Sequence, residues 1–292
     1  MYNAAEYIQE CIESVQNQTL NPYEIIVVDD GSTDMGRQIV EQFPSVKLIS
    51  QPNSGVTAAR RKGVEAAMGE WIYFMDADDT LPPTALELLA AGCSSHVDIV
   101  VGTRNKEKEL SRDNFIGAIL QNEIPLGPVN KLYKRILFDN INVLAIPREI
   151  VRGEDMLMLL RLANSTLRKV ALVKCTEYNY RSHSGQVTKT FATNSGYESM
   201  FYNVLKLSLS ETDRNIFLPL LIKTRITALC LIICRQKETL DYRVKQTDWF
   251  KELQGDMNRL SYKPTLWENL ILHVANSGNI KWLFRLRRLF MR

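Results

Sequence analysis

The sequence has few cysteines, and none of them form a pair at metal-binding spacing. Among its 292 residues the cysteines are Cys11, Cys93, Cys175, Cys230 and Cys234. No two of them are separated by only two residues, which excludes a zinc knuckle and a thioredoxin-like redox motif. Scattered thiols of this kind are typical of a reducing, cytosolic compartment.

Long apolar runs and a strong charge of one sign are also missing. The most apolar stretch, residues 226–234, has only nine residues, whereas a membrane-spanning helix needs about 20. No basic segment followed by an apolar run opens the chain, so we expect neither a signal peptide nor a transmembrane segment. The 36 basic and 33 acidic residues give a formal net charge of +3, a balance that does not point to nucleic acid as a partner.

Several signatures of phosphate binding and of hydrolysis are absent as well. The sequence contains neither a GxGxxG dinucleotide fingerprint nor a GxxxxGK[ST] phosphate loop. It also lacks the GxSxG and HExxH patterns of two hydrolase classes. Any bound phosphate would therefore have to be held by a metal ion and by basic side chains.

The first half of the chain alternates short apolar runs with helical patterns. Residues 24–28 (EIIVV) and 71–75 (WIYFM) read as strands, and each is followed by acids. Apolar strands separated by helices predict a mostly parallel sheet covered on both faces, and hence an α/β domain. Later in the chain only helical patterns remain. We therefore expect an α/β domain at residues 1–190 and a helical region at residues 191–292.

The N-terminus departs from this pattern. Residues 6–15 already read as a helix, and no apolar run precedes Tyr2. A doubly wound α/β domain normally opens with a buried central strand, so we expect that this strand is missing or that the true start lies upstream. Losing the strand would cost about 1.5–3 kcal/mol for each large apolar side chain that it buries.

Acidic clusters stand where two of the predicted strands end, at Asp29-Asp30 and at Asp76-Ala77-Asp78-Asp79. Ligands of open α/β sheets bind outside the carboxyl ends of the strands. Clustered carboxylates need a cation or several donors, and the spacing of Asp76 and Asp78 suits a hard divalent ion that also binds phosphate oxygens. Turn and helix-capping chemistry is the alternative, and for Asp79 it is equally good.

Several segments, in order, resemble family 2 glycosyltransferases of the GT-A fold. They are residues 2–8 (YNAAEYI), 14–19 (SVQNQT) and 24–34 (EIIVVDDGSTD), Asn53-Ser54-Gly55 with Ala59-Arg60, and residues 69–72 (GEWI), 76–79 (DADD), 130–133 (NKLY) and 153–155 (GED). The resemblance covers roughly residues 2–190. It implies an inverting enzyme of the bacterial surface-polysaccharide type, with a further strand ahead of Tyr2.

The resemblance also implies how a nucleotide-sugar donor, most often a UDP-sugar, would be bound. Tyr2 would lie against the uracil ring, and Asp30 would accept a hydrogen bond from the base, with its neighbour Asp29 as the second choice. Asp76 would contact the ribose or the metal shell. Asp78 would bind the metal and the diphosphate directly, with Mn²⁺ or Mg²⁺ as the implied cofactor.

Basic residues complete the implied donor site. Arg60 fits the family's arginine near the phosphates, but Arg61 stands where members often have asparagine, which leaves open which arginine faces inward. Arg181 and His183 fit a late loop that closes over the diphosphate. A surface position is the alternative for His183 and for Arg61.

An acidic pair, Glu154-Asp155, opens an apolar helix after Gly153. Acids in a first helical turn are stabilised by about 0.3–1 kcal/mol through the helix dipole, so capping alone explains them. The resemblance implies instead that Asp155 is the catalytic base and that Glu154 supports the acceptor or the loop. It also suggests Asn130 and Lys131 for the acceptor cleft, with a lysine on a helix surface as the alternative.

The last segment of the chain is basic and amphipathic. Lys281, Arg285, Arg288 and Arg292 recur on one helix face, and apolar residues cover much of the remainder. This pattern predicts that residues 279–292 bind an anionic membrane surface. The alternative is a terminal helix that packs on the rest of the protein.

Together these features predict a metal-dependent inverting glycosyltransferase with a GT-A domain. We expect it to transfer a hexosyl or N-acetylhexosaminyl group from a nucleotide-sugar to a hydroxyl of a glycan or lipid-linked acceptor. Its expected location is the cytoplasm, with the terminal helix as an attachment to the inner face of the membrane. A catalytically silent nucleotide-sugar-binding or scaffold protein and a nucleotidyltransferase are the alternatives, although the latter should carry a glycine-rich basic loop.

Overall fold

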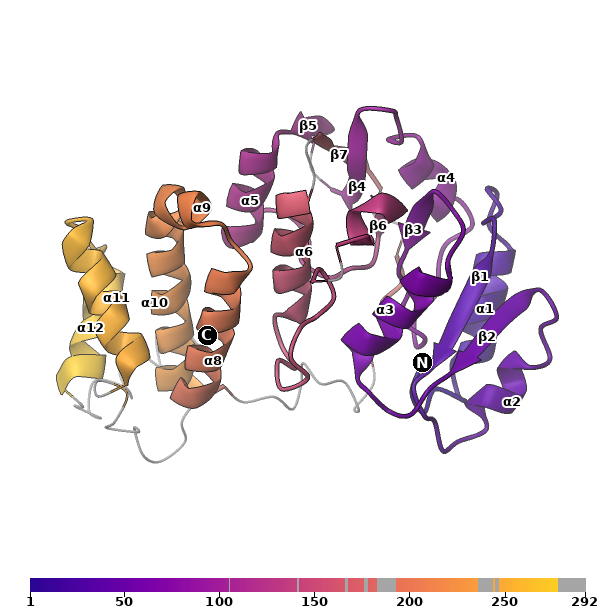
Figure 1. Ribbon diagram of the computed structural model, residues 1–292, viewed down its shortest axis with the longest axis horizontal. Coiled ribbons are helices and arrows are strands. Elements are labelled where there is room, and N and C mark those ends of the chain that lie inside the picture. Colours follow the sequence, from indigo (N-terminus) through magenta and orange to yellow (C-terminus); the bar gives the residue numbers. More distant parts are fainter. Residues whose placement is uncertain are drawn as a thin grey trace. The chain divides into compact units, whose positions relative to one another are not determined.

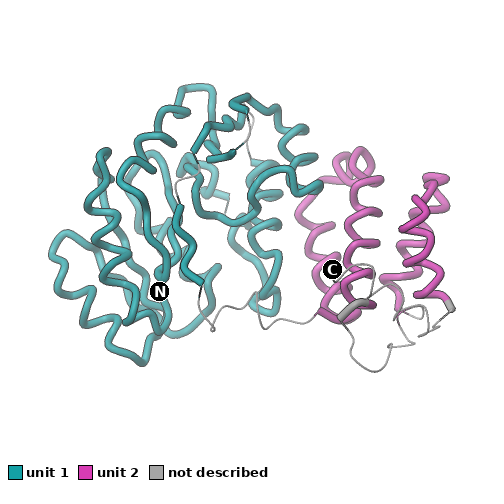
Figure 2. Tube along the Cα trace, turned by 180° about the vertical axis from the view of Figure 1, so that it is seen from behind, with its two compact units in different colours: residues 1–186 teal, residues 187–292 magenta. Residues whose placement is uncertain are grey.

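The computed structural model describes residues 1–104, 106–140, 142–165, 168–175, 178–182, 193–235, 244 and 247–277. The chain divides into two compact units, residues 1–186 and 187–292, which Figure 2 draws in different colours. Every strand in the described ranges belongs to the first unit. Among the described helices, none is long and apolar enough to cross a membrane.

The first unit begins with a two-stranded parallel sheet and three helices (Figure 1). These elements are α1 (Ile8–Gln16), β1 (Ile25–Asp29), α2 (Gly36–Val40), β2 (Val46–Ser50) and α3 (Val56–Ala66). Apolar side chains of α1, α2 and both strands form one core cluster, which includes Ile8, Ile12, Val27 and Val40. In β1 the consecutive residues Val27, Val28 and Asp29 are buried, so both faces of this half of the strand are covered.

A second sheet of five strands has the order β3-β6-β4-β7-β5. Its elements and their neighbours are β3 (Trp71–Tyr73), α4 (Ala85–Ala90), β4 (Val97–Thr103), β5 (Lys108–Leu110), α5 (Arg112–Leu120), β6 (Lys131–Lys134), η1 (Arg135–Phe138), α6 (Glu154–Ser165) and β7 (Lys169–Lys174). Strands β4 and β7 are parallel, whereas β6 runs antiparallel to β3 and β4, and β5 antiparallel to β7. Figure 1 shows α4 on one side of this sheet and α5 with α6 on the other. The predicted α/β class is confirmed, and the second sheet is mixed.

No strand in the described ranges joins the two sheets, and the edge of β1 away from β2 pairs with no described strand. Met1 occupies that edge of β1: its amine donates to the Val28 carbonyl at 2.6 Å, and its carbonyl accepts from the Asp30 amide at 2.9 Å. Hydrogen bonds of this pattern join neighbouring parallel strands.

The second unit is built of helices where it is described. They are α8 (Ser195–Leu207), α9 (Glu211–Ile216), α10 (Leu218–Arg235), α11 (Asp248–Arg259) and α12 (Leu266–Ser277). Side chains of Asn194, Ser210 and Thr247 cap three of them by accepting an amide hydrogen bond. Helices α9 and α10 are separated at Phe217, ahead of Pro219, whose missing N–H suits the first turn of a new helix.

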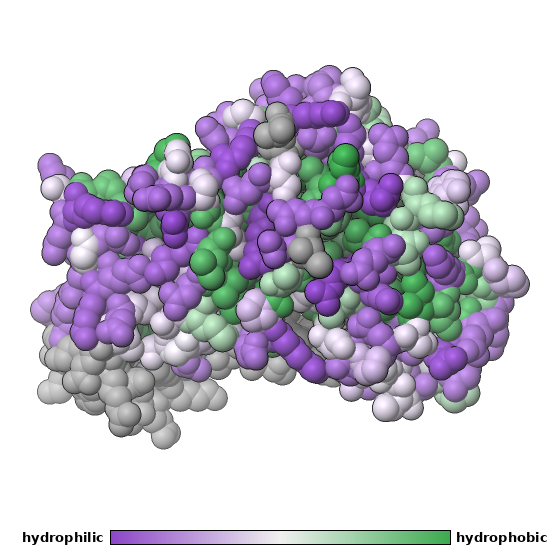
Figure 3. All heavy atoms as spheres, viewed as in Figure 1, coloured by the Kyte–Doolittle hydropathy of each residue, from purple (hydrophilic) through white to green (hydrophobic). Residues whose placement is uncertain are grey.

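The face drawn in Figure 3 is mostly hydrophilic, with apolar residues in small groups. Isolated apolar groups of this kind are normal on protein surfaces. The terminal segment, residues 279–292, and the predicted site residue His183 lie outside the described residues.

Candidate active site

A buried arginine connects two of the predicted acids. The Arg60 guanidinium, on α3, donates to Asp155 Oδ1 at 2.8 Å and to Asp76 Oδ1 at 3.4 Å. Its side chain is only 11% exposed, whereas those of Asp155 and Asp76 are 25% and 41% exposed. One guanidinium therefore links the start of α6 to the end of β3, at the rim of an accessible acidic site.

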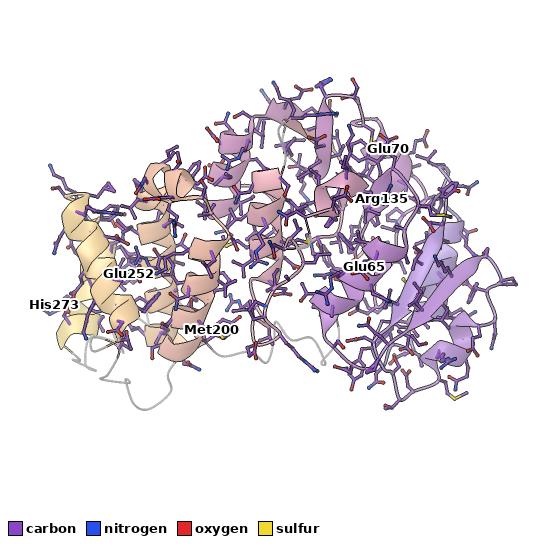
Figure 4. All side chains as sticks on the ribbon, viewed as in Figure 1. Glu65, Glu70, Arg135, Met200, Glu252 and His273 are labelled. Atoms are coloured by element: carbon purple, nitrogen blue, oxygen red, sulfur yellow. The ribbon has the colours of Figure 1, made fainter. Side chains whose placement is uncertain are left out.

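The structure also decides which of the two neighbouring arginines faces inward. Arg60 is the inner one. Arg61 pairs with Glu65 on the exposed side of α3 at 3.9 Å, and both side chains are about half exposed (44% and 55%); Glu65 is labelled in Figure 4. The solvated-surface interpretation of Arg61 fits this position.

The acidic pair predicted for catalysis sits in the first turn of α6. Gly153, with a positive φ of 87°, precedes the helix, which begins at Glu154. Burial raises the pKa of Asp155, and the Arg60 guanidinium opposes this shift. Burial and the neighbouring Asp155 charge raise the pKa of Glu154. Asp155 is thus a stronger base than an exposed aspartate, which suits proton transfer near neutral pH.

The cluster after β3 contains acids with different surroundings. Asp79 is 3% exposed; its carboxylate accepts from the Tyr178 hydroxyl at 2.7 Å and from the Arg181 amide at 2.8 Å. These bonds anchor residues 178–182 to the β3 end of the sheet. Asp79 therefore binds a segment that is distant in the sequence, whereas the carboxylate of Asp76 contacts Arg60.

Asp30 holds the start of the helix that carries Arg60. The residue is 4% exposed, and its carboxylate accepts from the amides of Ser54 (2.9 Å) and Gly55 (2.8 Å) and from the Gln51 side chain (2.7 Å). Gly55 has a positive φ of 90°, a conformation that favours glycine. The sequence did not reveal this role; the Asn53-Ser54-Gly55 turn ahead of the helix was the signal that could have done so.

The other residues predicted for donor binding are spread around this site. Tyr2 is 53% exposed, and Asp29 accepts from the Ser32 amide at 3.0 Å. Arg181 donates from Nε to the Asp78 carbonyl at 3.0 Å. The Arg181 guanidinium also pairs with Glu10 on α1. Their contacts with a nucleotide stay predictions.

The residues predicted for the acceptor cleft are held in the scaffold. Asn130 has a positive φ of 54° and donates from Nδ2 to the Cys175 carbonyl at 3.1 Å. A Cβ added at Gly102 would lie 2.4 Å from that Asn130 nitrogen, so glycine is required there. Lys131 is fully buried in β6, and the alternative of a lysine on a helix surface is wrong. The acceptor roles of both residues stay predictions.

The fit of a divalent metal can be tested on the donor set. Across the described ranges, no group of three His, Cys, Asp or Glu side chains could hold a metal ion. A Mg²⁺ or Mn²⁺ ion that shares its shell with phosphates needs only one or two carboxylates. Asp76 and Asp78 offer hard oxygen ligands at the strand end, and Asp76 is partly exposed. These residues therefore fit a metal that is completed by a substrate diphosphate.

Comparison with known proteins decides the family. Residues 1–145 match the family described as Glycosyl transferase family 2. Residues 1–145 belong to this family. A relative, EpsH of Bacillus subtilis (strain 168), is named as a glycosyltransferase and is 31% identical over 213 residues, or 65% of this chain. The match spans 61% of the length of EpsH.

Solved structures confirm the GT-A fold. TarS of S. aureus, residues 1–349 in complex with UDP, superposes with a TM-score of 0.68 at 20% identity and covers 100% of this chain and 89% of its own. Glucosyl-3-phosphoglycerate synthase of Mycobacterium tuberculosis, in complex with Mn²⁺, UDP and phosphoglyceric acid, gives a TM-score of 0.51 at 17% identity, covering 70% and 76% of the two chains.

Proposed function

We propose that this chain transfers a hexosyl or N-acetylhexosaminyl group from a UDP-sugar to a hydroxyl of a glycan or lipid-linked acceptor. One observation carries the proposal: the Arg60 guanidinium joins Asp155, at the start of α6, to Asp76, at the end of β3. A candidate base and a candidate donor-binding acid thereby share one partly exposed site. The UDP complexes of the two structural neighbours support the choice of nucleotide.

In the proposed reaction, Asp155 accepts the proton of the acceptor hydroxyl. The hydroxyl oxygen forms a bond to the anomeric carbon while the bond from that carbon to the diphosphate breaks, which inverts the anomeric centre. Arg60 orients Asp155 through its 2.8 Å hydrogen bond and favours the ionised carboxylate. Glu154 stands beside the base and supports the acceptor or the loop.

Departure of UDP requires compensation of the charge that grows on the diphosphate. Asp78 and Asp76 would hold Mn²⁺ or Mg²⁺, which supplies that compensation when bound. Arg181 and His183 are proposed for the diphosphate, Tyr2 and Asp30 for the uracil ring. Asp29 is the second choice for the hydrogen bond from uracil.

Residues 1–190 are proposed as the catalytic domain, and residues 191–292 as a helical region that works with it. For the terminal segment, 279–292, we propose attachment to anionic lipid at the inner face of the cell membrane. Co-sedimentation with anionic vesicles tests this part by itself. Loss of binding after deletion of 279–292 is expected, and unchanged binding would reject this segment as the anchor.

Turnover of a UDP-sugar panel tests the main proposal. Release of UDP should depend on a divalent ion and increase when a glycan acceptor is supplied, and the product should have the inverted anomeric configuration by proton NMR. Binding without turnover would favour the silent binding protein. Release of pyrophosphate from a nucleoside triphosphate and a sugar phosphate would favour the nucleotidyltransferase.

A further inference from the structure

Two side chains of β6 hold the segment that precedes this strand. Lys131 Nζ donates to the carbonyls of Gly127 at 2.5 Å and of Val129 at 3.4 Å. The Tyr133 hydroxyl donates to the carbonyl between them, that of Pro128, at 3.0 Å. Buried carbonyls must find donors, and here three consecutive ones are satisfied by side chains of the following strand.

A charged side chain is an expensive way to make these bonds. Lys131 is fully buried, and no described acid lies within ion-pair distance, 4.0 Å, of its Nζ. A neutral donor could serve the two carbonyls, whereas burial of an ammonium group is costly unless something nearby offsets it. Burial lowers the pKa of Lys131 to about 7, and the charge that opposes this shift is that of Asp155. The ammonium group therefore acts electrostatically on the proposed base.

Charged and titratable groups on several neighbouring elements act on Asp155. They are Arg60 on α3, Asp76 after β3, Lys131 and Tyr133 on β6, Glu154 on α6, and Tyr180. Arg60 is divided between two carboxylates, Asp155 and Asp76. Lys131 supplies a second positive charge, which is not shared in this way.

The segment held by Lys131 also lies close to the site. A Cβ placed on Gly127 would be 3.9 Å from the Tyr180 hydroxyl, and the charges of Asp76 and Asp155 act on that hydroxyl. We propose that Lys131 is a positioning residue for the transfer reaction: its ammonium group fixes residues 127–129 beside the site and keeps Asp155 ionised. This inference rests on the proposed function, in which Asp155 is the base.

The test is the pH dependence of kcat/KM for UDP release in four variants. K131Q removes the charge and keeps a donor, K131M removes both, and K131R keeps both. K62Q is the matched control, because Lys62 is an exposed lysine on α3. Loss of a nearby positive charge raises the pKa of a carboxyl group. The acid limb should therefore move to higher pH, by less than about one unit, in K131Q and K131M, and stay in place in K131R and K62Q. K131M should also have the lower kcat.

An unchanged acid limb in K131Q, or the same shift in K131R, would overturn the electrostatic role. An equal kcat in K131Q and K131M would overturn the role of the segment. If K131M fails to bind UDP because it is misfolded, K131Q and K131R still decide the electrostatic part, and Y133F, which loses only the bond to Pro128, decides the segment part. D155N is measured in the same series: if it retains turnover, the assignment of the base fails, independently of any result at Lys131.

Discussion

In the described part of each unit an enclosed arginine pairs with an aspartate, and these two arginines, Arg60 and Arg225, differ in what surrounds them. Arg60 bridges two carboxylates that remain 25% and 41% exposed. In the helical unit, Arg225 is 2% exposed, and its partner Asp256 is 17% exposed. The Arg225 guanidinium also lies 4.2 Å from the centroid of the Tyr202 ring, and its Nε and Nη1 atoms have no hydrogen-bond partner in the described part of the chain.

We expect this difference to separate an ion pair that takes part in the reaction from one that only supports the fold. A buried ion pair adds little net stability, because desolvation of the two charges offsets their attraction. Removal of one partner is nevertheless costly, because it leaves the other charge buried without compensation. A buried arginine with exposed carboxylate partners instead leaves those carboxylates accessible to a substrate while it controls their charge. We therefore expect changes at Arg60 to alter catalysis and changes at Arg225 to alter the stability of the fold.

The largest effect should follow from removal of the proposed base. D155N keeps the shape of the side chain and loses the proton acceptor, so UDP release from the donor should fall by about 10³-fold. UDP affinity, measured by calorimetry, should be nearly unchanged. Retained turnover, or loss of UDP binding in a folded variant, would contradict the role of Asp155.

Removal of the bridge should have the next largest effect. R60M leaves Asp155 and Asp76 without their shared cation, and we expect a fall in kcat/KM of about 100-fold. Burial already raises the pKa of Asp155, and loss of Arg60 should raise this pKa further. On acidification, R60M should therefore lose activity at a higher pH than the unmodified protein does. R61M, at the exposed neighbour, is the control and should behave as the unmodified protein does. Equal effects of R60M and R61M would contradict the assignment of Arg60 as the arginine that acts in the site.

Substitution of Arg225 in the enclosed Arg225–Asp256 pair should change the stability of the fold and leave UDP binding unchanged. R225M removes the cation from Asp256, which keeps Arg259 at 3.4 Å, so we expect a loss of about 1–2 kcal/mol in the free energy of unfolding. Denaturant unfolding measures this loss. UDP affinity in the folded protein should not change; a changed affinity would mean that Arg225 has a role beyond the fold of its own unit.

An exposed pair in the same unit should matter least. Lys206 and Glu252, the latter labelled in Figure 4, are 2.7 Å apart with side chains 25% and 40% exposed. E252Q should cost less than about 0.5 kcal/mol, because exposed ion pairs are weak and are screened by salt. A loss as large as that of R225M would show that burial is not what distinguishes the two pairs.

Much of the first unit was predictable from its local patterns. The run at residues 24–28 overlaps β1 and the run at residues 71–75 contains β3, because strong local propensity and burial agree there. The short strand β6 was not predicted. Its four residues, Lys131–Lys134, include two lysines, and all four are buried, which periodicity alone cannot indicate.

The site was predictable in its members but not in their connections. The resemblance named Arg60, Asp76 and Asp155 separately and assigned the arginine to phosphates. The ion pairs among them join residues 95 and 16 positions apart in the chain; such tertiary contacts leave no local signal. Asp30 was likewise named from the sequence, as an acid that binds uracil. Its hydrogen bonds with the turn before α3 could not be predicted.

The most direct test of the central claim, that these strand ends form a UDP-sugar donor site, is calorimetric titration with UDP in the presence and absence of Mn²⁺. It should be carried out on this chain and on D78A. We expect binding that requires Mn²⁺ and is lost in D78A. UDP binding that is independent of Mn²⁺ and unchanged in D78A would contradict the assignment of this site.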